Sequence, residues 1–209
     1  MVFKLPKIAI SVMLVSTILC SCTAIRVLTH EVTLKSELLN SGNYKNDPTH
    51  TSLIFKVNHF GFSNYIGRFN SVNATLNYES ENLSNSNIVA SIKTASIDTN
   101  SEILDAQLRG PFFFNSDSFP EAIFTSNNIK LTDKNQGKVI GTLRIKDKIA
   151  PMTLNVVFNG GGKNPLTQVD TLGFSATGSF NRSDFGLTTW LPAVGNTVII
   201  NIETEFIRQ

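Results

Sequence analysis

Apolar residues recur at every second position over most of this chain, and that period constrains the fold more than any other feature. Successive side chains of a β-strand point to opposite faces, so a period of two gives one apolar and one polar face. Turn residues separate the alternating segments, for example at 81–87, 133–137 and 160–165. About eight short strands at this spacing predict an all-β sandwich or barrel. The segments are 53–59, 72–78, 88–92, 139–145, 152–158, 174–180 and 198–206, with a less regular one at 123–131.

Small and large residues alternate on the predicted inner faces. Ala176 and Gly178 lie between Phe174 and Phe180, as is typical of strands that curl around an interior. The chain has 15 Phe but one Trp and three Tyr. Because Phe has no polar group, this excess indicates apolar volume to be filled or lined. The pattern therefore favours an antiparallel β-barrel.

One helix interrupts the strands. Thr99 and Glu102 match a capping box, Leu104 and Leu108 lie four residues apart, and Gly110 with the following proline ends the segment. Phe112, Phe113 and Phe114 follow, and three consecutive residues cannot all face one side of a strand. We expect them to form an apolar plug or lid where the helix meets the barrel.

The first residues resemble an export signal and not part of the fold. Two lysines precede an uncharged apolar run at 8–19, which is shorter than the ~20 residues of a membrane-spanning helix. The following Leu-Cys-Ser-Cys resembles a lipobox, which implies cleavage after Ser21 and lipidation of Cys22. The alternative is a plain secretory signal followed by a Cys20–Cys22 pair. We expect residues 1–21 to be a lipoprotein signal peptide, 22–43 a lipidated tether with a possible edge strand at 30–34, and 44–209 the barrel.

Charge and cysteine content exclude several classes of function. Removal of the signal takes two of the 18 basic residues and none of the 16 acidic ones, which leaves equal numbers. A balanced surface gives no reason to expect nucleic acid, whose phosphates need concentrated Lys and Arg. The predicted domain has no cysteine, so neither a disulfide framework nor a thiolate metal site is expected.

No catalytic or metal-binding motif is evident. The histidines are His30, His50 and His59, and their spacing matches no metal signature. His59 continues an inward-facing series, so we interpret it as a hydrogen-bonded histidine of the wall. No strand-turn-helix elbow surrounds Ser52, and the glycines at 160–162 lack the residues of a phosphate-binding loop.

Five charged residues lie beside apolar ones. Asp98, Asp105, Arg109, Arg182 and Asp184 are best interpreted as structural ion pairs that hold the helix against the strands. Alternatively, they line the mouth of the barrel and hold the polar head of a ligand.

Short motifs in order along the chain resemble the YceI-like family of periplasmic proteins. They are DPTH at 47–50, FKVNH at 55–59, GRF at 67–69, ASIDT at 95–99, LR at 108–109, FF at 112–113, FP at 119–120, FTS at 124–126, VIGTL at 139–143, RSDFG at 182–186 and VG at 194–195. The resemblance implies a lipocalin-like, eight-stranded antiparallel barrel with a short helix. It also implies a hydrophobic tunnel that holds a polyisoprenoid or a fatty amphiphile.

We therefore expect a non-enzymatic binding protein whose ligand is an isoprenoid or lipid, without cofactor or metal. The residues expected to contact the ligand are Phe55, Val57, His59, Phe69, Arg109, Phe124, Phe158, Phe174, Phe180 and Trp190, with His59 and Arg109 near a polar end. The anchor would place the protein at the cell envelope, on the periplasmic side of the outer membrane, and a homodimer is plausible in this family. The alternatives are an envelope enzyme that uses His50, His59 and Asp47, and a structural lipoprotein with a solid core.

Overall fold

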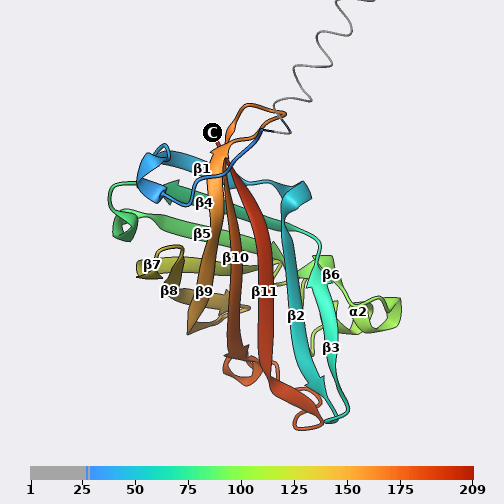
Figure 1. Cartoon of the computed structure of the whole chain (residues 1–209). Helices are drawn as coiled ribbons and strands as arrows, with labels where there is room; N and C mark the ends of the chain where they lie inside the picture. The colour runs from blue at the N-terminus through green and yellow to red at the C-terminus, as the bar shows by residue number, and fades with distance from the viewer. Residues whose placement is uncertain (1–26, 28) are drawn as a thin grey trace, which may run out of the picture.

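The computed structural model describes Val27 and residues 29–209, and its strands form one antiparallel sheet (Figure 1). The predicted signal peptide and Cys22 lie outside the described residues. The strands are β1 (Gly42–Asn46), β2 (Ser52–His59), β3 (Ser63–Phe69), β4 (Val72–Tyr78), β5 (Asn87–Lys93), β6 (Ile97–Asp98), β7 (Glu121–Asp133), β8 (Gln136–Ile145), β9 (Lys148–Lys163), β10 (Asp170–Asn181) and β11 (Val194–Arg208).

The sheet closes on itself through β11, which has three partner strands. One edge pairs with β10, while the other pairs with β2 near the start of β11 and with β1 at its end. Strand β1 also pairs with β4, so β1, β4, β5, β7, β8, β9, β10 and β11 form a closed ring of eight strands. Strands β2, β3 and β6 extend the wall beside β11 (Figure 1). The predicted eight-stranded barrel is confirmed.

Every alternating segment of the sequence lies within a strand, because each must bury one face. The pattern missed β1 and β3, in which Asn and Gly interrupt the alternation, and the two-residue β6. The edge strand expected at 30–34 is wrong. Thr33 makes only an isolated bridge to Gly161, and a 3-10 helix, η1 (Ser36–Leu38), follows it.

The segment around η1 is fastened across one end of the barrel. The Tyr44 hydroxyl donates to the Asn40 carbonyl at 2.6 Å, and the Tyr78 hydroxyl donates to the Ser36 carbonyl at 3.0 Å. Burial raises the pKa of Tyr78 to about 12. The Asn40 side chain also donates to Asp170 on β10. Two inward-facing tyrosines thus hold this segment against the end of the barrel that carries the C-terminus.

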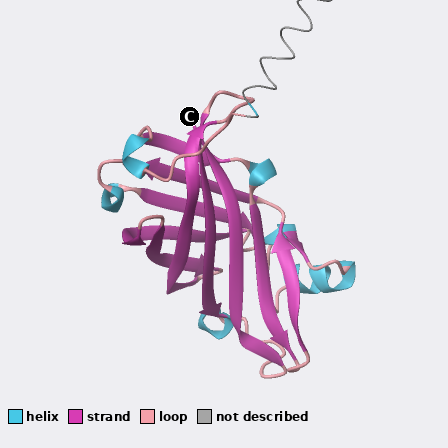
Figure 2. Ribbon diagram, viewed as in Figure 1, coloured by secondary structure: helices cyan, strands magenta, loops and turns pink. Residues whose placement is uncertain are grey.

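The single α-helix described is α2 (Glu102–Arg109), which lies outside the ring beside β3 (Figure 2). Ser101, not Thr99, is its N-cap, and its hydroxyl accepts from the Leu104 amide. Thr99 lies too far before the first turn to cap it. Its hydroxyl instead donates to the Asp105 carboxylate at 2.6 Å. The helix ends before Gly110 and Pro111, as expected. Among the described residues, no helix is both long and apolar enough to cross a bilayer.

Candidate functional site

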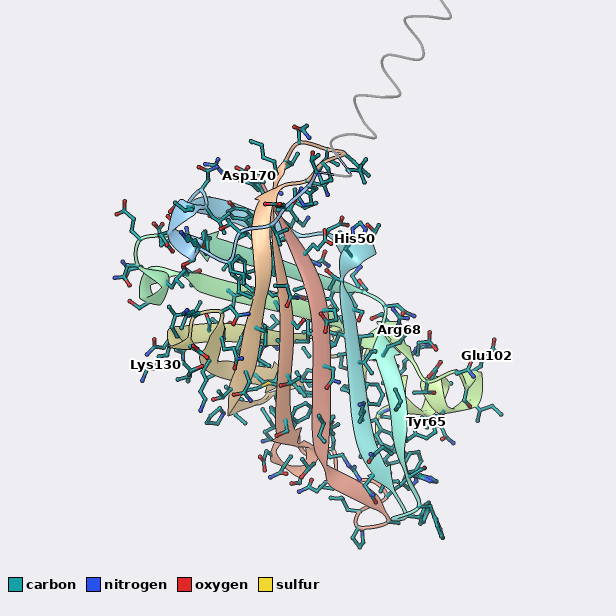
Figure 3. All side chains as sticks on the ribbon, in the orientation of Figure 1. His50, Tyr65, Arg68, Glu102, Lys130 and Asp170 are labelled. Atoms are coloured by element: carbon teal, nitrogen blue, oxygen red, sulfur yellow. The ribbon has the colours of Figure 1, made fainter. Side chains whose placement is uncertain are left out.

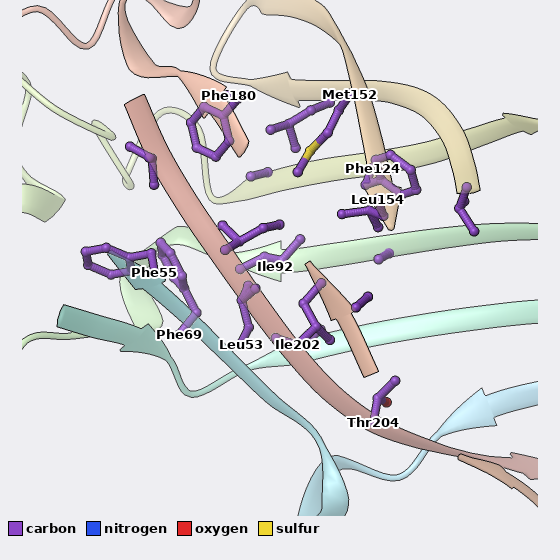
Figure 4. A pocket seen from close by; sticks show the side chains of 18 of the residues that line it. Leu53, Phe55, Phe69, Ile92, Phe124, Met152, Leu154, Phe180, Ile202 and Thr204 are labelled. Atoms are coloured by element: carbon purple, nitrogen blue, oxygen red, sulfur yellow. The ribbon is translucent and has the colours of Figure 1, made fainter. Parts of the chain in front are cut away.

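The interior of the barrel contains an apolar cavity of about 740 Å³. Inward-facing side chains from every strand of the ring except β1, from β2 and β3, and from α2 line it. Figure 4 shows Phe55 and Phe69 on one side and Phe124, Met152 and Leu154 on another. Nearly all of the residues expected to contact a ligand are among those lining it: Phe55, Val57, His59, Phe69, Phe124, Phe158, Phe174, Phe180 and Trp190.

The cavity stays open because the phenylalanines pack against one another along the wall. Ring centroids are 5.8 Å apart for Phe55 and Phe69 and 5.3 Å apart for Phe158 and Phe174. The Phe55 ring lies over Gly67 of β3, where a Cβ atom would overlap it. Between these rings the wall carries small side chains, namely Ala74, Ala90, Ala122 and Ala176. The interior is therefore not the solid core of the structural-lipoprotein alternative.

Polar groups meet the cavity at three places. At the end formed by the β2–β3 turn, these groups belong to His59, Tyr65, Thr99 and Arg182. At the opposite end, they belong to Ser36, Thr51, Tyr78 and Thr204. A third group, Lys134, Asn135 and Gln136, comes from the hairpin between β7 and β8. No sequence pattern indicates this third group, because a polar turn is usually solvent-exposed and nothing in its sequence shows that it contacts the cavity.

Arg109 does not line the cavity, contrary to its expected position near a polar end. Its guanidinium donates to the backbone carbonyls of Ala95 and Ile97, at 2.9 and 3.0 Å. The helix is thereby fixed to the segment that leads into β6. Arg182 does line the cavity, but its guanidinium also donates only to carbonyl groups. The expected ion pairs between these arginines and the aspartates are therefore wrong, since main-chain oxygens occupy the donors.

The three consecutive phenylalanines divide between the interior and the surface. Phe113 and Phe114 line the cavity, and Phe114 packs edge-on against Phe69 with centroids 5.7 Å apart. Phe112 is 79% exposed. Two of the three rings thus form part of the cavity wall at this end of the barrel, and the third faces solvent.

The histidines lie at opposite ends of β2, as Figure 3 shows for His50. A separation of nine residues along a strand corresponds to about 30 Å. His50 and His59 cannot act on one bond, so the proposed catalytic set of His50, His59 and Asp47 is not brought together. In the part of the chain that the structure describes, no three His, Cys, Asp or Glu residues are grouped to hold a metal ion.

His50 forms a surface pair with Asp47, its Nδ1 lying 2.7 Å from the carboxylate. The hydrogen bond from His50, followed by those from Thr49, lowers the pKa of Asp47 to about 2, and the bond to Asp47 raises the pKa of His50. The carboxylate stabilises the fold above its unfolded pKa of about 3.9 and loses this effect as pH falls towards 2. The imidazole contributes fully below about 6.5 and loses its effect as pH rises through its raised pKa.

We expect the pair to contribute most between about pH 4 and 6.5. NMR titration of the His50 ring protons should give a pKa above that of an unpaired histidine, and Asp47→Asn should lower this pKa towards the ordinary value, leaving the part that Glu205 contributes. The same titration in Asp98→Asn, which removes a carboxylate that does not act on His50, should leave the His50 pKa unchanged. An ordinary pKa in the unsubstituted protein would contradict the pairing.

Comparison with known proteins agrees with this fold. Residues 44–206 match the family model described as the YceI-like domain. The chain belongs to the YceI-like family. Its curated relatives include protein YceI of Salmonella arizonae, 31% identical over 184 residues that cover 85% of this chain and 95% of that protein. A UPF0312 protein of Pectobacterium atrosepticum is 30% identical over 191 residues, covering 91% of this chain and 97% of the relative.

Solved structures show the same architecture as this YceI-like chain. The YCEI protein of Campylobacter jejuni, 27% identical, superposes with a TM-score of 0.66 over 74% of this chain and 91% of that one. BcnA of Burkholderia cenocepacia, 22% identical, has a TM-score of 0.69 over 77% and 98%. A domain of Saccharophagus degradans described as polyisoprenoid-binding has a TM-score of 0.55 at 12% identity, over 81% of this chain and all of that one.

Proposed function

We propose that this YceI-like barrel binds one slender apolar chain, a polyisoprenoid or a comparable long-chain amphiphile, inside its cavity. The observation that carries the proposal is the apolar cavity of about 740 Å³. Small-molecule sites are typically ~300–1,000 Å³ and mainly apolar, with a few polar groups that fix orientation. The description of the Saccharophagus domain as polyisoprenoid-binding supports the same class of ligand.

The chemistry of the wall matches such a ligand. Burial of apolar carbon contributes ~0.8 kcal/mol per methylene, so a few isoprene units can outweigh the cost of ordering the chain. His59 and Tyr65 lie near one end of the cavity, and Lys134 of the β7–β8 hairpin also lines it. Either place can accept the polar head of an amphiphile while its chain follows the phenylalanines. The lining presents no pair of activated groups for bond cleavage, so binding without turnover is the function that we propose.

The cellular setting follows from the proposed export signal. With Cys22 lipidated, the barrel would remain at the cell envelope, most simply on the periplasmic face of the outer membrane. There it would carry, store or sense the bound lipid. The homodimer stays a prediction.

We expect the protein purified from its native host without detergent to contain close to one lipid per chain. Mass spectrometry of an organic extract identifies the lipid, and native mass spectrometry of the intact protein gives the stoichiometry. Incubation of the loaded protein should leave the mass of the lipid unchanged, whereas a shortened or isomerised product would favour the enzyme alternative. If no lipid is extracted, and the protein takes up neither a quinone nor a long-chain amide, the proposed function is wrong.

A further inference from the structure

Three loops meet at the end of the barrel opposite the C-terminus. They are the β2–β3 turn at 60–62, the loop between α2 and β7 at 110–120 and the loop before β11 at 186–193. The Phe60 amide donates to the Ala193 carbonyl at 2.9 Å, and the Thr189 hydroxyl donates to the Phe112 carbonyl at 3.0 Å. The loops therefore form one continuous surface, and the β2–β3 turn projects at the lower end of the barrel in Figure 1.

This surface exposes aromatic side chains. Phe62 is 92% exposed, Phe112 79%, Phe60 57% and Trp190 44%. We call these four residues the aromatic rim. Single exposed apolar residues are common, but a contiguous group of large rings marks an interaction site. Phe60 and Trp190 also hold positive φ angles, 54° and 66°, a conformation in which bulky residues are uncommon.

The rim is continuous with the cavity. Phe60 and Trp190 line the cavity with their buried parts, and Trp190 packs on Phe113 with ring centroids 4.7 Å apart. A ligand that enters at this end therefore moves directly from the partner that covers the rim into the cavity, whose wall is apolar.

The charge of the surface identifies its partner. The three loops contain no Lys or Arg, and Asp117 is their one acidic residue. Nearby charges have both signs, with Lys148 beside Asp147 on the β8–β9 turn and an exposed Asp184 before the third loop. An aromatic surface without basic residues matches the interfacial layer of a bilayer, where Trp and other rings are favoured, and does not depend on anionic lipid. A polyisoprenoid is itself dissolved in a bilayer. A rim that contacts the bilayer therefore places this end of the cavity next to the ligand.

We propose that the aromatic rim inserts into the surface of a phospholipid bilayer, so that a ligand passes between bilayer and cavity without crossing water. The purpose of this contact rests on the proposed function, although the contact can be measured independently of it. A second copy of the chain is the rival occupant, but pairing through the rim would close the mouth of the cavity.

Trp190 is the sole tryptophan of the chain and therefore reports on the rim alone. The full-length protein is mixed with phosphatidylcholine vesicles in which part of the acyl chains carries bromine, a contact quencher. We expect Trp190 emission to shift to the blue and to be quenched, with little dependence on salt. A lipid anchor at Cys22 would tether every variant equally, so quenching reports where the rim lies and not whether the protein is bound.

Phe62→Asp is the decisive variant, because Phe62 is almost fully exposed and is not a lining residue of the cavity. A carboxylate is disfavoured in the bilayer, so quenching should fall about tenfold. Leu166→Asp is the matched control. Leu166 is 67% exposed in the β9–β10 connection at the other end of the barrel, and quenching should be unchanged.

Uptake of a quinone from dilute solution is measured on the same samples, to separate this proposal from the proposed function. Normal uptake by Phe62→Asp shows that the variant is folded. Quenching of equal size in the unsubstituted protein and Phe62→Asp would mean that brominated lipid enters the cavity without docking, which overturns the rim and leaves the proposed function standing. Absence of quenching, or a dimer in sedimentation that Phe62→Asp dissociates, would likewise overturn it.

Discussion

Replacing Arg182 with methionine is expected to destabilise the protein by about 3 kcal/mol, because several carbonyl groups lose their donor and each buried one left unsatisfied costs ~1–3 kcal/mol. Arg182 is only 6% exposed, and its guanidinium donates to the carbonyls of Gly195 and Val194 at 2.8 and 2.9 Å. It also donates to the carbonyls of Leu187 and Thr189. One side chain thus satisfies two carbonyl groups of the loop before β11 and two at the start of β11.

Methionine fills much of the same volume but offers no donor, so these oxygens would lie buried without partners. Burial lowers the pKa of the guanidinium, but arginine remains charged at neutral pH. Lysine is not an adequate substitute, because it lacks the planar fork that reaches several carbonyls at once. We therefore expect Arg182→Lys to recover only a small part of the lost stability.

Urea denaturation followed by circular dichroism measures the effect. Arg144→Met is the control, since Arg144 makes one hydrogen bond of 3.3 Å, to the Lys146 carbonyl, and lies closer to solvent. Arg144→Met should lower the free energy of unfolding by less than about 1 kcal/mol. Equal losses in the two variants would show that the carbonyl network of Arg182 is not a special source of stability. The loop that this network holds carries Trp190, so Arg182→Met should also alter Trp190 fluorescence before unfolding.

Filling the cavity is expected to weaken lipid binding by about 50-fold, because a ring that displaces three methylenes of the ligand removes ~2.4 kcal/mol of apolar burial. Ala176 of β10 suits this test, since its small side chain lines the cavity. A phenylalanine there adds a ring to a volume that is already empty. An extra side chain in a filled core lowers the free energy of unfolding by ~1–3 kcal/mol. Because the ring of Ala176→Phe enters a cavity, we expect a smaller loss of stability.

The matched control is Ser179→Phe on the same strand. Ser179 points to the outer face and is exposed, so its substitution adds an equal ring without entering the cavity. Affinity is measured by titration with a fluorescent long-chain amphiphile. Equal affinities for Ala176→Phe and Ser179→Phe would place the ligand elsewhere. A loss in both would point to general damage to the barrel.

The period-2 pattern was sufficient to predict the strands whose two faces differ. Residues 139–145 or 174–180 place apolar groups on one side only, and no other regular structure buries them. Strand β3 escaped notice because Ser63 and Asn64 conceal the alternation of Tyr65, Gly67 and Phe69. Spacing alone indicates Thr99 as the helix cap, whereas Ser101 occupies the position from which a hydroxyl reaches the first turn.

The aromatic lining was predicted well because inward faces of strands can be identified from alternation. The roles of the charged residues could not be predicted in this way. The sequence shows neither how far a guanidinium lies from a carboxylate nor which carbonyl groups lack partners. Arg109 and Arg182 both bind main-chain oxygens, which have no sequence signature. The aromatic rim likewise joins three loops separated by tens of residues, and no local pattern connects Phe62 with Phe112 or Trp190.

The all-β class, the inward faces and the resemblance to the YceI-like family follow from the sequence alone, because alternation and short motifs are local properties of the chain. Only the folded chain shows that β11 closes the ring through β1, that the rings of Phe55 and Phe158 lie along the wall and leave a cavity, and that three loops with exposed aromatic rings meet at one end of it. Whether a barrel is hollow depends on how side chains from distant strands pack together, and this packing is set only when the sheet closes.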